Sequence, residues 1–272
     1  MRHSARIMMV LSSAGCAALP PVVARLPEVT VHAADPEVGA RGVRAWKACS
    51  DHVPEILGID SRWHGRIVFL SEEVWGPSCA FFDPGGTIYV GSELQETEAE
   101  LTFVLAHELT HALAKDEWVE LLPSALQEGI ATWVGSRVTN RPAAPADWYP
   151  PMQDVRRMLT LSPEDFAKVD QGYLECVAAW YVQHLGLDYI RERAQAGGVF
   201  EVLSARHRLT HYGADGSILA EDYAAGLPFG GSTPEGTVRT EVDLVFVPGE
   251  PVVPGRPSIP ASGVLDDELL DH

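Results

Sequence analysis

The sequence has 272 residues, of which 46% are hydrophobic and 21% are charged. This composition excludes a wholly disordered or collagen-like chain, and the length is enough for one domain with a buried core. Acidic residues outnumber basic residues by 38 to 20, and the resulting formal net charge of −18 disfavours nucleic acids and anionic lipid surfaces as partners. No apolar stretch reaches the roughly 18 residues that a membrane-spanning helix needs, so we expect no membrane span.

The N-terminus resembles an export signal. A basic start with Arg2 and Arg6 leads into a short apolar run, and small residues around Ala24 follow the break at Pro20-Pro21. We therefore expect residues 1–24 to be a signal peptide and the protein to be extracytoplasmic: secreted, periplasmic or lipid-anchored. Two alternatives stay open, namely a lipoprotein signal in which Cys16 is acylated, and an intracellular protein whose first residues form a fraying helix.

The patterns along the chain predict mixed α and β structure. An extended lead is expected at residues 25–34, and a helix at 36–57, since Asp35-Pro36 favours helix initiation. Strands are expected at 66–70 and 87–90, followed by a helix at 97–114 that opens with a capping box at Thr97. Further helices are expected at 124–135, 173–185 and 188–196, with a short helix starting at Ser162 and a loop at 140–151.

The amino-acid composition of the chain changes near its C-terminus. We expect the main domain to cover residues 25–225 and a β-type extension to cover residues 226–247. Residues 248–272 are expected to be a Pro-rich and then acidic tail, because proline recurs at every third residue from Pro248 to Pro260. That spacing matches the polyproline II repeat and favours a semi-rigid spacer.

Three cysteines remain outside the expected signal: Cys49, Cys79 and Cys176. An oxidising compartment would allow two of them to pair, and the positions of Cys49 and Cys79 around the first structured segment favour a disulfide between these two. No pair has the C-x-x-C spacing of a thiolate metal site.

The most informative residues are His107-Glu108-Leu109-Thr110-His111. Two histidines four residues apart lie on one face of a helix, one turn from each other, so both imidazoles can bind one zinc ion. Glu108 lies about 100° around the helix from His107, beside the metal, where it can act as a general base toward water. The alternative is a partly buried helix face with satisfied hydrogen bonds and no metal.

A third candidate ligand follows at Glu128, within Leu126-Gln-Glu-Gly-Ile-Ala131 near the start of the next helix. Catalytic zinc usually takes three protein ligands, and two histidines with a glutamate are one common set. Two antiparallel helices joined at Pro123 would bring Glu128 back to the histidines. We therefore expect one Zn²⁺ ion held by His107, His111 and Glu128.

Together, the H-E-L-T-H and L-Q-E-G-I-A segments resemble the gluzincin zinc metallopeptidases of the peptidase MA-like type. The resemblance implies an α+β, zincin-like fold, with a small mixed sheet whose edge strand lies over the metal-binding helix and a mainly helical subdomain after it. The edge strand would contain Tyr89 and Val90 and bind the substrate backbone. One departure is Thr132, which stands where thermolysin-like members carry an aspartate.

The resemblance also implies a peptidase mechanism acting on a peptide or protein substrate. Glu108 would take a proton from the attacking water and deliver it to the leaving amine. Gluzincins often use a downstream Tyr or His to stabilise the oxyanion, and Tyr173 is the first candidate for this catalytic role here. The sequence leaves the oligomeric state open.

Two rival interpretations remain. The chain could be an exported non-catalytic binding protein with a structural zinc site, although such a site has no need of Glu108 as a base. It could also be an intracellular metallohydrolase. His207 and His211 are likewise four apart, but Arg208 between them disfavours a second cation site.

Overall fold

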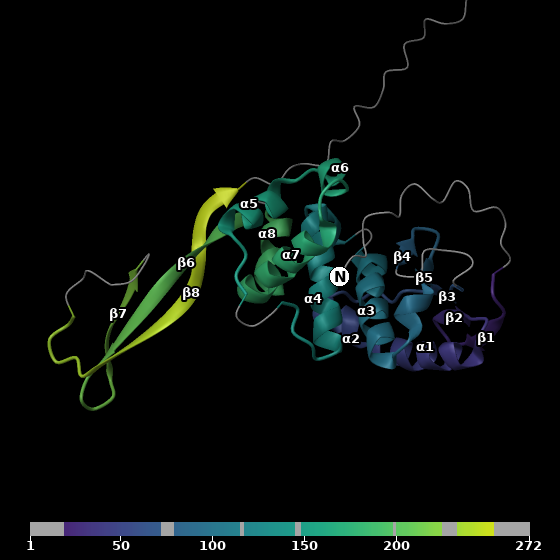
Figure 1. Cartoon of the computed structure of the whole chain (residues 1–272), viewed down its shortest axis with the longest axis horizontal. Coiled ribbons are helices and arrows are strands. Elements are labelled where there is room, and N and C mark those ends of the chain that lie inside the picture. Colours follow the sequence, from purple (N-terminus) through teal and green to yellow (C-terminus); the bar gives the residue numbers. More distant parts are fainter. Residues whose placement is uncertain are drawn as a thin grey trace, which may run out of the picture.

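The structure is a computed structural model that describes residues 19–71, 79–114, 117–144, 148–197, 200–224 and 233–252. The expected mixed α+β architecture with a small mixed sheet is confirmed. Figure 1 shows an N-terminal sheet with helices, a mainly helical part after it, and a second sheet near the C-terminus. Cys16 and the acidic tail lie outside the described residues.

The first sheet has five strands in the order β1-β2-β3-β5-β4. The strands are β1 (Val22–Arg25), β2 (Val29–His32), β3 (Gly65–Phe69), β4 (Ala80–Asp83) and β5 (Thr87–Val90). The central pairs β2–β3 and β3–β5 are parallel, whereas β1 and β4 are antiparallel to their neighbours. The sheet is therefore mixed, with an antiparallel strand at each edge.

The expected edge strand is not at the edge. β5 lies between β3 and β4, so both of its backbone edges are already hydrogen-bonded, and β4 is the strand at the border of the sheet. The prediction that β5 is the edge strand is therefore wrong, and substrate binding by Tyr89 and Val90 stays a prediction. The reason is the turn at Gly85-Gly86, which folds β4 back along β5 as a hairpin, whereas the sequence analysis expected no strand at residues 80–83.

Two helices pack against this sheet: α1 (Pro36–Cys49) and α3 (Glu98–Ala114). The Asp35 side chain caps α1 by accepting from the Glu37 N–H at 2.8 Å, and the Thr97 hydroxyl accepts from the Glu100 N–H at 3.1 Å at the start of α3. The helix expected at 36–57 is divided by a break after Cys49, and α2 (His52–Leu57) follows it.

The helix pair α3 and α4 (Ser124–Val138) carries the candidate site, and α7 (Gln171–Leu185) covers α4. Glycines permit this close packing: a Cβ at Gly129 would lie 2.2 Å from Cβ of Ala178, and a Cβ at Gly135 would lie 3.0 Å from the Phe103 side chain. His107 of α3 lies beside Thr132 of α4, and Phe103 lies beside Gly135, so residue numbers fall along one helix as they rise along the other. The two helices are therefore antiparallel, as expected.

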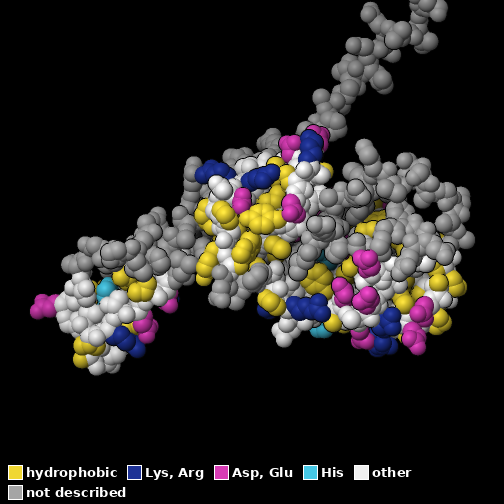
Figure 2. Space-filling model, viewed as in Figure 1, with side chains coloured by type: hydrophobic (Ala, Val, Ile, Leu, Met, Phe, Trp, Pro, Cys, Tyr) yellow, Lys and Arg dark blue, Asp and Glu magenta, His cyan; other side chains and the backbone are white. Residues whose placement is uncertain are grey.

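The remaining short elements complete the helical part. They are η2 (Ser92–Gln95), η3 (Trp118–Leu121), α5 (Met152–Thr160), α6 (Pro163–Phe166) and α8 (Leu187–Gln195). Leu187 begins α8 directly after Gly186, whose φ of 82° ends α7 as the sequence predicts. On the face shown in Figure 2, acidic and basic side chains are interspersed around α1 and α3. Between these two helices, Arg44 pairs with Glu98 at 2.7 Å.

A second, three-stranded antiparallel sheet has the order β7-β6-β8. It consists of β6 (Phe200–Tyr212), β7 (Ile218–Ala224) and β8 (Arg239–Val252), and it projects from the helical part beyond α5 (Figure 1). The domain boundary expected at residue 225 therefore divides a sheet whose strands come from both sides of it. Pro248 and Pro251 belong to β8 and pair with β6, so the expected Pro-rich tail starts inside a strand.

At the other end, Val22–Arg25 forms β1, which is antiparallel to β2, and the carbonyl of Pro21 accepts from the Ala33 N–H at 3.1 Å. A signal peptide that ended at Ala24 would remove most of this strand. Within the described residues, no helix combines the length and apolar character needed to cross a membrane.

Candidate metal centre

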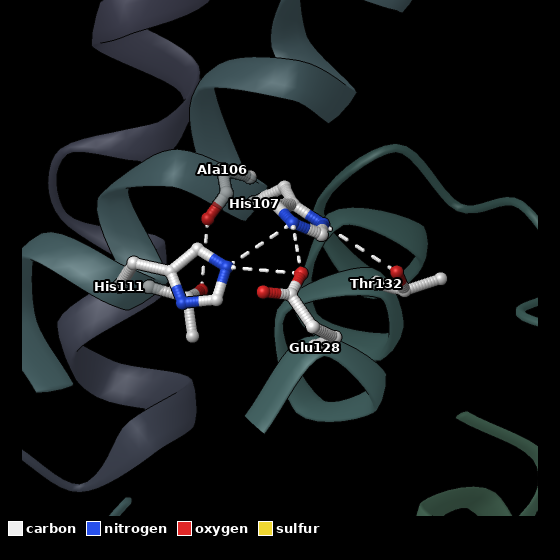
Figure 3. A network of polar contacts seen from close by, with 6 residues as sticks. Ala106, His107, His111, Glu128 and Thr132 are labelled. Atoms are coloured by element: carbon white, nitrogen blue, oxygen red, sulfur yellow. Dashed lines mark hydrogen bonds and ion pairs between the residues drawn. The ribbon is translucent and has the colours of Figure 1, made fainter. Parts of the chain in front are cut away.

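His107 and His111 lie on one face of α3, as their spacing predicts. Their Nε2 atoms are 3.2 Å apart and turned toward each other (Figure 3). The apolar residues Leu105 and Leu109 are fully buried on the other faces of α3, and this burial fixes the rotation of the helix.

Glu128 reaches the two histidines from the first turns of α4. Its Oε2 lies 3.2 Å from Nε2 of His107 and 3.3 Å from Nε2 of His111. Across the described part of the chain, His107, His111 and Glu128 are the group whose ligand atoms come within 4.8 Å of one another. The structure thus brings together the three residues that the sequence predicts as ligands.

The geometry of these three atoms fits a tetrahedral ion. Zinc ligands at about 2.0–2.1 Å from the ion and at tetrahedral angles lie about 3.3 Å from each other. The three observed separations are 3.2 to 3.3 Å. All three side chains keep some solvent access, with 14%, 21% and 26% exposure for His107, His111 and Glu128, so water and substrate can reach the centre.

The electrostatics of the ion-free cluster favour a carboxylate beside imidazolium. Burial opposes ionisation of Glu128, but His111 and His107 outweigh it and hold the pKa of this carboxyl well below its usual range. Burial likewise opposes protonation of His111, and the Glu128 carboxylate overcomes it and raises the pKa of His111 to about 9. A divalent cation would satisfy the same carboxylate and displace the histidine proton.

Glu108 lies next to this cluster and is only 6% exposed. Burial raises its pKa, while His107 and His111 act in the opposite direction. Its carboxylate accepts a hydrogen bond from the backbone N–H of Phe82 in β4. A buried carboxylate with a raised pKa, held beside a ligand set, has the properties of a general base.

The hydrogen bond from Phe82 to Glu108 also shows which edge of β4 faces the site. The Gly91 N–H donates to the Cys79 carbonyl at 2.8 Å, so Cys79 and Phe81 form the hydrogen-bonded pairs with β5. The alternating backbone groups of Ala80 and Phe82 therefore point away from β5, toward the open edge next to Glu108. Sequence reasoning missed this edge because β4 is only four residues long.

Tyr173 is not brought to the cluster. It lies in the first turn of α7, where its hydroxyl donates to Oδ2 of Asp154 at 2.6 Å and its ring lies edge-on to Trp148. Burial and then Asp154 raise its pKa to about 12. Of the described residues of α7, Gly172, Glu175 and Cys176 line the cavity at the site, but Tyr173 does not. Its role as oxyanion donor stays a prediction.

The structure does not contain the expected disulfide between Cys49 and Cys79, because neither cysteine is part of a disulfide bond. The Cys49 thiol donates to the carbonyl of Thr102, and burial raises its pKa to about 12. Burial and then the charge of Glu108 raise the pKa of Cys79. Thr102 and Glu108 are six residues apart, about 9 Å along α3, so the two thiols lie against different parts of this helix.

His207 and His211 lie on β6 of the second sheet rather than on a helix. Nδ1 of His211 is 2.8 Å from Oγ1 of Thr240 in β8, so this imidazole is part of the sheet packing. Among the described side chains, the structure does not bring His211 into the cluster around Glu128.

Thr132 is a site residue that the sequence pointed to only as a departure from a motif. It lies one turn after Glu128 on α4, and its Oγ1 is 3.4 Å from Nδ1 of His107 (Figure 3). The hydroxyl therefore contacts the imidazole on the side opposite to Glu128. Contacts of this kind orient metal-binding histidines.

A cavity of about 290 Å³ opens beside His107 and Glu108. β4, α3, α4 and α7 contribute to its wall, which is apolar around Phe103 and Val104 and carries Glu100 and Arg141 among its described charged residues, with Glu175 on α7. The cavity gives an extended chain room next to the candidate base.

Comparison with known proteins bears on the same segment. Residues 70–148 match the model of peptidase family M48, a family of zinc metallopeptidases. No curated protein and no solved structure matches the chain. The matched segment contains β4, β5, α3 and α4, and so all of the candidate ligands. The metal-site segment of this chain is thus similar to peptidase family M48 over residues 70–148, and the resemblance to zinc metallopeptidases predicted from the two motifs is confirmed.

Proposed function

We propose that the protein is a zinc-dependent peptidase in which His107, His111 and Glu128 hold one zinc ion and Glu108 is the general base. The observation that carries the proposal is the convergence of the three ligand atoms at 3.2 to 3.3 Å, with a buried carboxylate beside them. The family match over the same segment supports zinc and peptide chemistry.

When bound in such a site, zinc lowers the pKa of water toward about 7 and polarises a carbonyl oxygen. The Glu108 carboxylate accepts the proton of the attacking water and then donates it to the leaving amine as the C–N bond breaks. The Phe82 N–H holds this carboxylate in place through its hydrogen bond. The raised pKa of Glu108 suits a group that must both accept and release the proton.

The free edge of β4 gives the substrate a backbone partner. The outward N–H and C=O of Ala80 are available for an extended peptide to add as a further strand, a common mode of peptide recognition. Ala80 also lines the cavity that contains His107 and Glu108, so a peptide paired there would pass the base.

We also propose that the protein acts outside the cytoplasm. The basic start, apolar run and small residues before residue 25 support export. Because β1 begins at Val22, processing next to Cys16 would leave this strand whole, whereas processing at Ala24 would not. Mass spectrometry of protein from its native host tests the proposal, since an intact Met1 contradicts it.

The central proposal is tested by measuring zinc content together with cleavage of an unfolded protein substrate. We expect near-stoichiometric zinc in the wild type and in Glu108→Gln, with cleavage at least about 100-fold slower in Glu108→Gln because the base is lost. Glu128→Gln should lose most of its zinc. Zinc retained in Glu128→Gln would contradict the ligand assignment, and undiminished cleavage by Glu108→Gln would contradict the assigned base.

A further inference from the structure

We propose that Arg141 recognises a carboxylate of the substrate, about three residues from the bond that is cleaved. The inference rests on the proposed function and names a class of substrate for the same site. The carboxylate could belong to an Asp or Glu side chain or to the C-terminus of the peptide.

The end of α4 fixes the position of Arg141. Asn140 has a φ of 53°, the left-handed conformation that ends many helices, and the N–H of Arg141 donates to the carbonyl of Ser136 at 2.9 Å. This hydrogen bond involves only the backbone of Arg141. The cap therefore holds the residue at the cavity wall, while its side chain stays available.

The cavity connects Arg141 to the candidate base. On α3, Glu100 and His107 both line the cavity, and their separation of seven positions spans about 10 Å. Because α4 is antiparallel to α3, Thr132 lies beside His107 and Gly135 beside Phe103, so the C-terminal end of α4 lies toward Glu100. An extended peptide covers about 3.3 Å per residue, so roughly three residues fit between His107 and the Arg141 end.

Charge makes Arg141 distinctive in this wall. Among the described lining residues it is the one Lys or Arg, and no ion pair joins its guanidinium to another described residue. The chain carries a net charge of −18, which would repel an acidic substrate. A guanidinium binds a carboxylate through two parallel hydrogen bonds, whereas it gains little from an apolar side chain.

Glu100 supplies the matched control. It lines the same end of the cavity and carries the opposite charge, so it disfavours the carboxylate that Arg141 attracts. Replacing either residue by glutamine removes one charge and leaves a polar, uncharged side chain. The two variants should therefore change the preference for acidic substrates in opposite directions.

The experiment uses the zinc-loaded full chain and a peptide whose cleavage site has been mapped. One pair of peptides, amidated at the C-terminus, carries Glu or Gln at the third residue from the scissile bond on either side. A second pair ends at that position with a free acid or an amide. We expect the wild type to prefer the carboxylate form of at least one pair by about 10- to 100-fold in kcat/KM. Arg141→Gln should abolish this preference, and Glu100→Gln should increase it.

The pair that responds identifies the source of the carboxylate. Equal cleavage within both pairs by the wild type, or an unchanged preference in Arg141→Gln, would overturn the inference. Binding of the same labelled peptides to Glu108→Gln, with and without Arg141→Gln, separates this failure from failure of the proposed function. If the wild type cleaves nothing while Glu108→Gln still binds the carboxylate form more tightly through Arg141, the peptidase proposal fails and the carboxylate site stands.

Discussion

Oγ1 of Thr132 lies 3.4 Å from Nδ1 of His107, while Nε2 of the same imidazole faces Glu128 at 3.2 Å. Glu128 and Thr132 lie one turn apart on α4, and they contact the two nitrogens of His107 with a carboxylate and a hydroxyl, respectively. A hydroxyl that accepts from Nδ1–H fixes the ring with Nε2 unprotonated and directed at the ligand position.

This contact predicts the effect of removing the hydroxyl. Thr132→Val preserves the shape of the side chain but leaves Nδ1 of His107 without its partner on α4, and zinc affinity should fall by about 10- to 100-fold. Competition with a chromogenic chelator measures the affinity. Thr132→Ser keeps the hydroxyl and should stay close to the wild type, so equal losses in both variants would assign the effect to packing instead.

The open edge of β4 can be tested by removing one backbone donor. Ala80→Pro deletes an N–H that points away from β5, so the β4–β5 hydrogen bonds should survive. Loss of one substrate hydrogen bond should lower kcat/KM by roughly 3- to 10-fold. Phe81→Pro is the control, because its N–H belongs to the pair with Tyr89, and it should destabilise the fold. A wild-type kcat/KM for Ala80→Pro would rule out strand addition at this edge.

His111 should titrate near pH 9 in the zinc-free protein, far above the usual range, because the Glu128 carboxylate stabilises its protonated form. Its protonated form therefore stabilises the zinc-free fold below about pH 6.5, and this contribution is lost as the pH rises through about 9. NMR titration of the imidazole measures the pKa directly. In Glu128→Gln the pKa of His111 should fall, and an unchanged value would show that Glu128 is not its cause.

Cys49 predicts a loss of stability in alkaline solution. Its folded pKa is about 12, against an ordinary value near 9, so the thiol stays protonated in the fold while the unfolded chain ionises. Stability is fully present below pH 9 and should fall by about 1.4 kcal/mol per pH unit above it. Urea unfolding between pH 8 and 11 measures the slope. Cys49→Ala should lack this component, and equal slopes in the two proteins would contradict the assignment.

The site was predictable from sequence because its chemistry depends on local spacing. His107 and His111 are one helical turn apart whatever the rest of the fold does, and Glu128 follows a helix break that returns the chain. The features that were missed depend on long-range pairing. β4 occupies the edge expected for β5, Cys49 faces Thr102 instead of Cys79, and β6 pairs across residue 225 with β8. None of these partners is set by spacing along the chain.

The contact between Gly129 and Ala178 also limits how this site could be transferred to another protein. Gly129 directly follows the candidate ligand Glu128, and α7 approaches so closely that a Cβ at Gly129 would overlap Cβ of Ala178. A designer who copied only α3 and α4 onto a new scaffold would lose the surface that sets the depth of the carboxylate. The smallest unit that could be transferred is therefore the three helices α3, α4 and α7. Gly129 and Ala178 would have to be kept together with the metal ligands.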